Sequence, residues 1–274
     1  SAREGDGITR FSKNFSWYRG ECLIDALDTL KLNLNLTKAP LRFPIQDIYK
    51  FDERRIISGR IESGSVKIGD EILFSPSNKT ASIKSIETWN YEGKKESAQS
   101  GDSVGITLDD QTFVERGEIV SHLYSPPIET DVFRARIFWF GHEKLNVGMK
   151  LLMKISTNEV EVYVQSIEKI ISIDDLTETS AENVSRHQFA ELVLRSRSLI
   201  AVDEGEKIFP TGRFGLIHNF KLVAGGLISM EGYADQRNVR KKVATNVTRV
   251  EHRVAVAERA KKNNHSPGIF WLTG

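Results

Sequence analysis

The sequence has 274 residues, about twice the length of a common domain, so two bodies with their own cores are expected. Its 38 Lys and Arg residues balance 37 Asp and Glu residues, which gives a net charge of +1. A protein that binds a phosphate backbone over a wide surface needs an excess of positive charge. The composition therefore argues against nucleic acid as a partner.

Cysteine content and hydropathy indicate the compartment. Cys22 is the single cysteine, so no internal disulfide forms, and this usage fits a reducing environment. No apolar run approaches the roughly 18 residues that span a bilayer, and the opening SAREGDGITR has no signal-peptide core. We expect a soluble protein of the cytoplasm that has no membrane partner.

A short amphipathic helix is expected near the N-terminus. Leu23, Ile24, Leu27 and Leu30 recur at a spacing that places them on one helical face. Such an apolar face should dock on something. Cys22 precedes this face without a second cysteine or a basic cluster to activate it, so we expect it to be buried and unreactive.

From Leu41 onward the sequence changes to short apolar runs separated by turn residues, which predicts antiparallel β structure. Ser125-Pro126-Pro127 interrupts these runs, because proline lacks the amide hydrogen that a β ladder needs. Short strands avoid edge-to-edge pairing by closing into barrels. We therefore expect an all-β chain with two consecutive antiparallel β-barrels, over residues 39–125 and 126–231.

Glycines mark the expected turns. VKIGDEILF at 66–74 and LNVGMKLLM at 145–153 share a pattern in which a turn precedes a core strand. Gly59, Gly64 and Gly69 stand five residues apart in the first barrel. Because glycine adopts positive φ without steric cost, we expect all three to lie in tight turns.

The C-terminal part has a different composition. Basic residues outnumber acidic ones between Arg237 and Lys262, and no aromatic residue that could stack on a base lies between them. We expect residues 232–267 to form a charged linker, mobile or loosely helical, and not an RNA-binding segment. The chain then finishes on the apolar segment GIFWLTG at 268–274.

The first barrel segment carries a family resemblance. RIISGRIESGSVKIGDEILF resembles the second domain of translation-factor GTPases such as elongation factor Tu, in which a GRIxxGxxxxGD pattern recurs. Trp17, the expected helix and PLRFPI at 40–45 resemble the path from the G domain of these proteins into their first barrel. By this resemblance, residues 1–38 are the end of a G domain and its connecting helix.

The first residues extend the resemblance. Ser1-Ala2-Arg3 followed by Gly5-Asp6-Gly7 is similar to the last guanine-contacting loop of these GTPases. The resemblance implies that Ser1, Ala2 and Arg3 contact the guanine of GTP, with the Ala2 backbone amide facing O6. No GxxxxGK[ST] segment that could cradle phosphates occurs in the sequence.

The second barrel resembles a particular branch of this family, the large subunits of sulfate adenylyltransferases. The resemblance rests on ARIFWF at 135–140, the stretch from Gly148 to Lys154, and the closing segments TGRFGLI at 211–217 and VAGGLI at 223–228. Between the two closing segments the chain reads HNFKLV, where relatives usually carry an Asn-Ala-Thr-like stretch. The first barrel fits too, with expected turns at Glu92-Gly93 and Gly101-Asp102 and a strand end at Leu108-Asp109-Asp110.

The closing GIFWLTG resembles the first strand of adenylylsulfate kinases as it enters their phosphate loop, with Gly274 as the first glycine of an ATP-binding loop. The resemblance implies a fused, bifunctional protein. Its activities are the formation of adenosine 5′-phosphosulfate from ATP and sulfate, driven by GTP hydrolysis, and the phosphorylation of that product. Its implied partners are a small catalytic subunit and its own G and kinase domains.

GTP, ATP and Mg²⁺ belong to that longer protein, and this chain is expected to hold no cofactor, no metal and no catalytic residue. His142-Glu143, Asp109-Asp110 and Asp174-Asp175 adjoin expected turns, where exposed polar residues are ordinary. Arg195-Ser196-Arg197-Ser198 alternates like a strand with a basic face, which suggests a solvated sheet edge or a contact with a partner protein.

Two other functions remain open. The barrels could hold aminoacyl-tRNA, as in a translation elongation factor, or they could form an interaction module without coupled chemistry. A GxxxxGK[ST] loop completed beyond Gly274 would support sulfate activation and exclude both alternatives.

Overall fold

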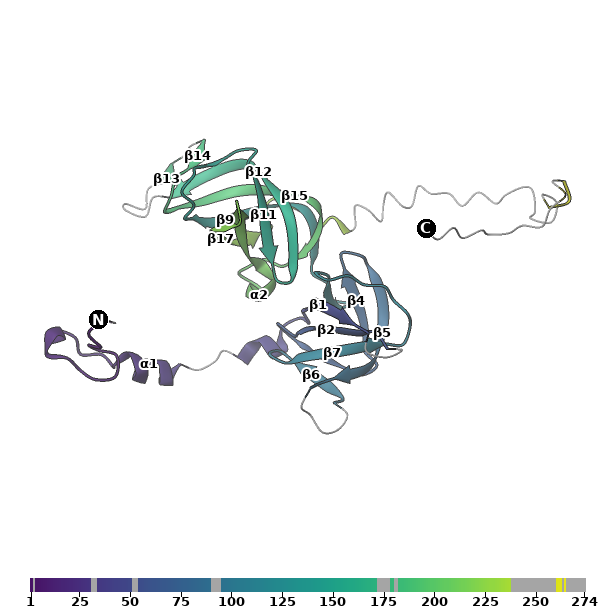
Figure 1. Ribbon diagram of the computed structural model, residues 1–274, viewed down its shortest axis with the longest axis horizontal. Helices are drawn as coiled ribbons and strands as arrows, with labels where there is room; N and C mark the ends of the chain where they lie inside the picture. Colours follow the sequence, from purple (N-terminus) through teal and green to yellow (C-terminus); the bar gives the residue numbers. More distant parts are fainter. Residues whose placement is uncertain are drawn as a thin grey trace. The chain divides into compact units, whose positions relative to one another are not determined.

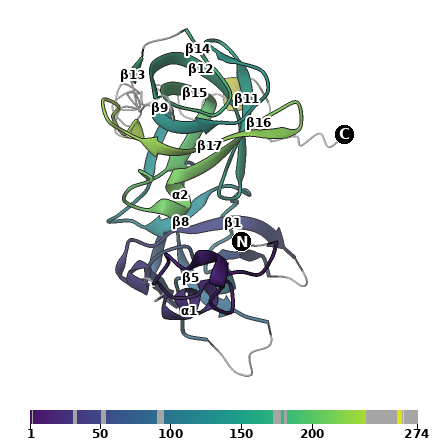
Figure 2. The same cartoon turned by 90° about the vertical axis from the view of Figure 1, so that its left-hand side faces the viewer.

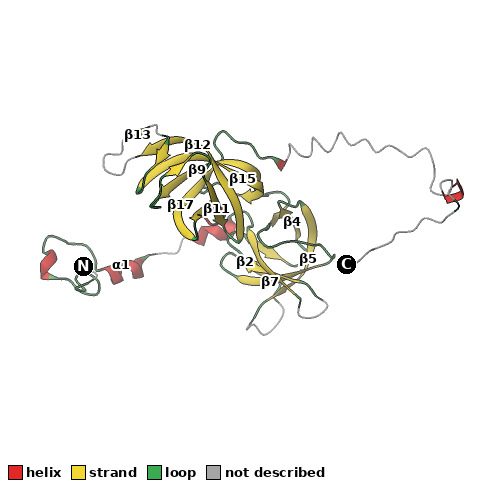
Figure 3. Ribbon diagram, turned by 45° about the horizontal axis from the view of Figure 1, so that its top comes forward, coloured by secondary structure: helices red, strands yellow, loops and turns green. Residues whose placement is uncertain are grey.

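The computed structural model describes residues 1, 3–30, 34–50, 54–89, 95–171, 178–179, 182–237, 260–262 and 264. The chain divides into two units, Ser1–Ala234 and Asp235–Gly274. Strands dominate the first unit, and its helices are short (Figure 3). The expected linker at 232–267 falls largely outside the described residues, and the segment at 268–274 falls entirely outside them.

Six antiparallel strands close the first barrel (Figure 1). Their order around the barrel is β1 (Phe43–Tyr49), β2 (Ile56–Arg60), β7 (Ser103–Leu108), β5 (Lys79–Glu87), β4 (Glu71–Ser75) and β8 (Ile119–His122). Because β1 pairs with both β2 and β8, the sheet has no free edge. A separate ribbon pairs β3 (Ser65–Lys67) with β6 (Ser97–Gln99).

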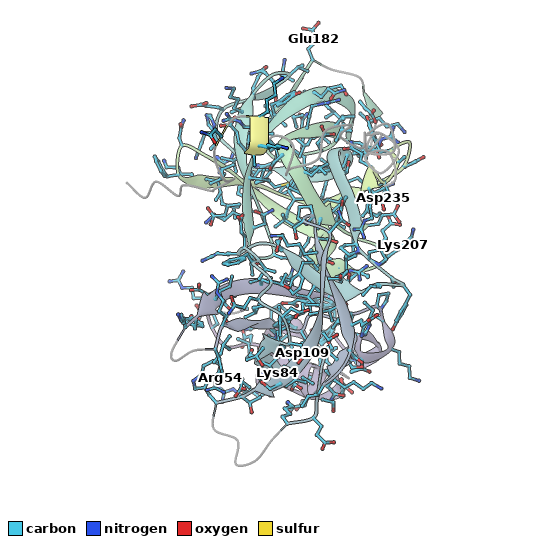
Figure 4. All side chains as sticks on the ribbon, turned by 90° about the vertical axis from the view of Figure 1, so that its right-hand side faces the viewer. Arg54, Lys84, Asp109, Glu182, Lys207 and Asp235 are labelled. Carbon is cyan, nitrogen blue, oxygen red and sulfur yellow. The ribbon has the colours of Figure 1, made fainter. Side chains whose placement is uncertain are left out.

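Alternating side chains fill the first barrel. Its largest fully buried residues include Phe43, Phe74, Ile45, Ile57 and Ile83. Each such side chain stabilises the barrel by roughly 1.5–3 kcal/mol relative to its exposed state. The exposed side chains of Arg54, Lys84 and Asp109 belong to the same barrel (Figure 4).

The second barrel also closes with six strands (Figure 2). Their order is β11 (Lys150–Ile155), β16 (Arg213–His218), β17 (Lys221–Ser229), β9 (Ile128–Trp139), β15 (Gln188–Val202) and β12 (Asn158–Ile171), and β12 pairs back with β11. The short strand β13 (Glu178–Thr179) pairs antiparallel with the end of β12, and β10 (Leu145–Asn146) pairs with β14 (Asn183–Val184). The predicted all-β fold with two consecutive barrels is therefore confirmed.

The core of the second barrel is built around Trp139, which is 1% exposed. Its indole Nε1 donates a hydrogen bond of 2.9 Å to the carbonyl oxygen of Glu143, so the only polar atom of this buried side chain is satisfied. Phe133 packs edge-on against Phe214 with ring centroids 6.3 Å apart.

The helices are short. α1 (Leu23–Thr29) and α2 (Phe209–Gly212) are α-helical, and Lys13–Phe15 and Leu34–Lys38 are 3-10 helices. Across the described ranges, no helix is both long and apolar enough to cross a membrane. The predicted N-terminal helix is confirmed, and Cys22 before it is buried.

The expected docking of α1 is not seen within the described part of the chain. The four residues of its apolar face are 42–70% exposed: Leu23, Ile24, Leu27 and Leu30. Their exposure leaves a contiguous apolar surface that nothing described here covers.

The two segments that share a sequence pattern, 66–74 and 145–153, have the same local structure. Gly69 and Gly148 both adopt positive φ, +86° and +82°, two residues before the first residue of strands β4 and β11. The amide of Gly69 donates to the Ile83 carbonyl at 2.8 Å, and the amide of Gly148 donates to the Val164 carbonyl at 2.8 Å. The predicted turn before a core strand is thus confirmed in both barrels.

Gly59 is not in a turn, which corrects the expectation. Gly64 and Gly69 have positive φ as predicted, but Gly59 lies inside β2 with an ordinary φ. A Cβ at Gly59 would collide with the Pro44 carbonyl oxygen and lie 3.0 Å from the Phe43 ring. The constraint on Gly59 is therefore the close approach of β1.

Two further expectations concern strands and turns. Gly101 adopts φ of +96° and β7 ends at Leu108, as predicted, whereas Glu92-Gly93 lies outside the described residues.

The expectation that Arg195–Ser198 forms a sheet edge is wrong. β15 lies between β9 and β12, and its ladder to β9 is interrupted between Arg195 and Ile200, where Ser196 Oγ donates to the Ser198 carbonyl at 2.7 Å.

The close approach of β1 to Gly59 predicts that a side chain at this position lowers the stability of the protein. Gly59→Ala should destabilise the protein by about 1–3 kcal/mol, because the added methyl group overpacks the contact between β1 and β2. Gly225→Ala is the matched control, since Gly225 is also a strand glycine of ordinary φ and an added Cβ there meets nothing within 4 Å. Urea denaturation of the two variants checks this, and equal stability losses would contradict it.

Candidate functional site

The N-terminal loop, where the guanine contact was predicted, is held by local hydrogen bonds. The Ser1 amino group donates to the Asp6 carbonyl at 2.8 Å. The Asp6 carboxylate accepts from Asn14 Nδ2 at 2.8 Å, and this bond, with one from Ser12, lowers the pKa of Asp6. Arg3 is exposed and lies 3.5 Å from the Glu4 carboxylate.

The same loop caps α1. Cys22 provides no side-chain cap, but the amides of Leu23 and Ile24 donate to the carbonyls of Gly7 and Ile8 at 2.9 and 3.0 Å. These bonds satisfy two of the amide groups that a helix start leaves unpaired. Ala2 and Gly274, the other predicted contacts to GTP and ATP, lie outside the described residues.

A buried ion pair joins residues of the two barrels. Arg42, directly before β1, donates from Nε and Nη2 to the two carboxylate oxygens of Asp203 at 2.7 and 2.8 Å. Asp203 directly follows β15. The side chains are 3% and 8% exposed, so this bidentate pair is shielded from water.

The remaining polar atoms of this pair are also occupied. Arg42 Nη1 donates to the carbonyls of Leu41 and Ser125, each at 2.8 Å, and Thr211 Oγ1 donates to Asp203 at 2.5 Å. A buried charge pair offsets its desolvation cost only when its other donors and acceptors are satisfied. Arg42 thereby holds Asp203, the linker carbonyl at Ser125 and its own strand in one network.

An open cavity of about 930 Å³ is lined by residues of both barrels. The first barrel contributes Pro44, Gln46, Arg60 and Glu62. The second contributes a row on the outer face of five neighbouring strands, which the register defines as Lys154, Gly215, Gly225, Phe138 and Phe189. Gly215 and Gly225 have no side chains and form the floor of the cavity. Phe138 and Phe189, whose ring centroids are 4.9 Å apart, border this floor.

Four cationic side chains line the cavity. Arg136 pairs with Glu206 at 2.8 Å, and Lys154 pairs with Glu159 at 2.8 Å. Arg213 instead lies over the Phe209 ring at 5.0 Å. Within the described residues, neither Arg60 nor Arg213 forms an ion pair. The cavity is therefore apolar at its floor and moderately basic at its rim.

A second, more polar cavity of about 1030 Å³ lies at the β3–β6 ribbon of the first barrel. Two turns of the same design border it. Asp70 accepts from the Lys67 amide at 2.9 Å and contacts His122 Nε2 at 3.3 Å. Asp102 accepts from the Gln99 amide at 3.0 Å and from Lys95 Nζ at 2.8 Å. Both aspartates act here as turn caps.

Burial disfavours the ionised form of Asp102. The hydrogen bonds from Lys95 and from the Gln99 amide outweigh that effect and lower the pKa of this carboxyl below its ordinary 3.8.

His142-Glu143, Asp109-Asp110 and Asp174-Asp175 are the pairs that were expected to be ordinary polar residues near turns. The backbone carbonyl oxygen of Glu143 accepts a hydrogen bond from the Trp139 indole, and the Glu143 carboxylate lies 3.4 Å from His218 Nε2. Asp109 and Asp110 follow the end of β7, and Asp174-Asp175 lies outside the described residues. Among the described side chains, no group of three or more His, Cys, Asp or Glu residues could hold a metal ion.

Comparison with known proteins places the second barrel in a family. Residues 132–229 match the model described as GTP-eEF1A C-terminal domain-like. The second barrel is similar to this family over those residues. The match runs from within β9 to the end of β17 and so includes most of the strands that close the second barrel.

The chain as a whole has homologues in elongation-factor-1α-like proteins. It is 29% identical to Bifunctional enzyme NodQ of Rhizobium sp. (strain N33), over 100% of this chain and 41% of that protein. It is 32% identical to Elongation factor 1-alpha of Metallosphaera sedula, over 82% of this chain and 53% of that protein. It is 28% identical to Sulfate adenylyltransferase subunit 1 of Aeromonas hydrophila, over 85% of this chain and 49% of that protein.

The chain therefore spans about half the length, or less, of the curated relatives that it matches. Among solved structures, Sup35 complexed with GDP is similar with a TM-score of 0.66 and 24% identity, over 83% of this chain and 56% of that one. This likeness supports the double-barrel fold that carries the GTP-eEF1A C-terminal-like barrel.

Sequence reasoning missed the Arg42–Asp203 pair, whose members stand 161 positions apart. The available signal was that each charge interrupts an apolar run, in LRFPI for Arg42 and in LIAVD for Asp203. A charged residue within a core strand pattern needs a partner. The sequence did not reveal which partner each one has.

The buried pair predicts a large stability loss when one partner is removed. Arg42→Met should cost about 3–5 kcal/mol, because Asp203 then keeps a buried charge without its counterion. Lys154→Met is the control, since it removes an exposed pair worth at most about 1 kcal/mol. Chemical denaturation distinguishes them. An Arg42→Met variant as stable as Lys154→Met would show that the pair does not hold the barrels.

The lowered pKa of Asp102 predicts a pH dependence. Because the folded-state pKa lies below 3.8, the stabilising contribution is present above that pH and is lost as the pH falls through the folded-state value. Lys95→Met should therefore reduce stability at pH 7, by at most about 1 kcal/mol for such a part-exposed pair. The difference from wild type should shrink toward pH 3 in urea denaturation, and a constant difference would be the contrary result.

Proposed function

We propose that the chain is the barrel region of a sulfate adenylyltransferase large subunit fused to an adenylylsulfate kinase. The observation that carries the proposal is the extent of the matches. NodQ, a bifunctional enzyme by name, matches 100% of the chain, whereas Sulfate adenylyltransferase subunit 1 and Elongation factor 1-alpha match 85% and 82%. A match to a bifunctional enzyme over the whole chain supports this proposal.

The proposed domain layout follows the sequence. Residues 1–38 are the end of a G domain and its connecting helix, residues 39–125 and 126–231 are the barrels, and residues 232–267 are a linker to a kinase that begins at 268. In the longer protein, GTP hydrolysis drives the formation of adenosine 5′-phosphosulfate from ATP and sulfate. A separate small subunit transfers the adenylyl group, and the kinase domain phosphorylates the product.

The barrels act in this proposal as a rigid platform for the G domain. Two surfaces support that role: the apolar face of α1, whose residues are 42–70% exposed, and the cavity of about 930 Å³ with the Phe138–Phe189 contact. Exposed apolar area of this kind favours a covering partner. Arg60 and Arg213 at the cavity rim, which form no ion pair with the described residues, favour an acidic edge on that partner.

The chain itself does not fit GTP, ATP or Mg²⁺ as resident groups. Phosphoryl transfer needs a backbone cradle with a lysine and a hydroxyl on the metal ion, and the sequence contains no such GxxxxGK[ST] segment. The loop at Ser1 offers at best one or two hydrogen bonds to a base, about 1 kcal/mol each, against the roughly 8 kcal/mol of micromolar binding. The nucleotide chemistry of the proposal therefore lies outside these residues.

A second candidate is a translation factor whose barrels hold aminoacyl-tRNA. The observation in its favour is the identity of 32% to Elongation factor 1-alpha of Metallosphaera sedula. Against it stands the net charge of +1, which supplies little of the phosphate neutralisation that binding of tRNA requires. In either case the proposed compartment is the cytoplasm, in agreement with the reduced Cys22.

The test is an assay of the complete protein together with the small subunit. We expect ATP and sulfate to give adenosine 5′-phosphosulfate only when GTP is hydrolysed, and ATP with adenosine 5′-phosphosulfate to give the phosphorylated product. The 274-residue chain alone is the control and should give none of these products above a blank. Submicromolar binding of aminoacyl-tRNA without sulfate activation would instead establish the second candidate.

A further inference from the structure

Three polar side chains of the first barrel form a hydrogen-bonded relay that ends at an exposed tyrosine. Asp70, directly before β4, contacts His122 Nε2 at 3.3 Å, and the other ring nitrogen, Nδ1, lies 3.1 Å from the Tyr124 hydroxyl. His122 ends β8, and its pairing with Ile72 on β4 brings it to Asp70, which is 52 positions away in the chain. The Asp70–His122–Tyr124 relay thus places a carboxylate, an imidazole and a phenol in sequence.

The donor and acceptor roles in the relay follow from its inner end. An ionised carboxylate only accepts hydrogen bonds, so His122 donates to Asp70 from Nε2. The neutral ring then has its lone pair on Nδ1, which accepts a hydrogen bond from the Tyr124 hydroxyl. A base that is hydrogen-bonded to a hydroxyl and is itself oriented by a third group is the arrangement that activates a nucleophile.

The inner part of the relay is held in place, and its outer part is accessible. The side chains of Asp70 and His122 are each 16% exposed, and the Lys67 amide also donates to Asp70 at 2.9 Å. The Ser125 amide donates to the His122 carbonyl at 3.2 Å, which closes the turn that carries Tyr124. Tyr124 is 84% exposed. Its phenol is therefore both fixed against a base and open to a reagent.

The surroundings of the relay favour an anionic reagent. All three members of the relay line the polar cavity of about 1030 Å³ at the β3–β6 ribbon, together with two lysines. Lys95 pairs with Asp102 at 2.8 Å, whereas Lys67 forms no ion pair with the described residues. A cation without a counterion attracts an anion, and a hydroxyl with an adjacent base is suited to acyl transfer. An acyl phosphate combines both properties.

We propose that Tyr124 is a nucleophile that takes an acyl group from an anionic donor of the acyl phosphate class. Tyr124 Oη attacks the carbonyl carbon, and its proton passes to His122 Nδ1. The bond between the carbonyl carbon and the phosphate oxygen breaks, and the phosphate leaves with the electron pair and takes the proton from the imidazolium. Asp70 stabilises that imidazolium. The product is an O-acyl ester of Tyr124, a modification that goes beyond the proposed function.

The test treats the 274-residue chain with acetyl phosphate and follows the acetylation of each tyrosine by peptide mass spectrometry. Tyr18 is the reference in the same molecule, because its hydroxyl donates to the Glu21 carbonyl at 3.1 Å and so has no base beside it. Tyr124 should react at least about tenfold faster than Tyr18. That ratio exceeds the roughly twofold difference in their exposure, 84% against 44%.

Three variants separate the roles of the neighbouring groups. His122→Gln should remove the excess rate of Tyr124, because an amide takes up no proton. Asp70→Asn keeps an oxygen for the Lys67 amide, so its melting temperature should stay within about 2 °C of wild type, but acetylation of Tyr124 should slow at least about fivefold. Lys67→Met should slow the reaction with acetyl phosphate and leave the reaction with neutral N-acetylimidazole unchanged.

The wild-type ratio decides the inference even where a variant does not fold. Acetylation of Tyr124 at the rate of Tyr18, or an excess that persists in folded His122→Gln, would overturn it. An equal effect of Lys67→Met on both reagents would remove the assignment of an anionic donor. Nitrogen NMR gives an independent readout, in which neutral His122 should be protonated at Nε2, and protonation at Nδ1 would refute the relay.

Discussion

The double-barrel body depends on one buried interaction, the bidentate pair between Arg42 and Asp203. Arg42 stands just before the first strand of one barrel, and Asp203 stands just after the long strand β15 of the other. The pair is completed by Thr211 and by the Ser125 carbonyl in the connecting segment. Because a buried charge without its partner is costly, the two barrels and their linker are tied to one arrangement. Hydrophobic burial fills each barrel, but it is nondirectional and does not by itself specify how one body meets another.

Much of the fold was predictable because its signals are local. Apolar alternation and turn glycines predicted the two barrels. The sequence pattern shared by the segments around Gly69 and Gly148 corresponds to the same turn in both barrels, with equivalent hydrogen bonds. The errors arose where a residue's constraint comes from a neighbouring strand. Gly59 is required by the approach of Pro44, and Arg195 lies in an interior strand because of its pairing with β9 and β12. Strand order is a long-range property, and periodicity along one segment does not contain it.

The candidate site was less predictable than the fold. The pairing of Arg42 with Asp203 and the cavity floor of Gly215 and Gly225 both depend on register between distant segments. The predicted nucleotide contacts rest on resemblance, and two of them, Ala2 and Gly274, lie outside the described residues. The structure instead directs attention to surfaces, namely the exposed face of α1 and the basic rim of the cavity. These features suit a platform that other domains and subunits use, which is the role proposed here.

The central claim is that the Arg42–Asp203 pair fixes the barrels as one body, and a distance measurement between them tests it most directly. Spin labels at Lys84 on β5 and Lys150 on β11 occupy exposed positions, one on each barrel. Cys22→Ser leaves the introduced cysteines as the only labelling sites. Double electron–electron resonance should give one narrow distance distribution for the protein with the pair intact and a broad one for Arg42→Met. The same narrow distribution in both proteins would contradict the account.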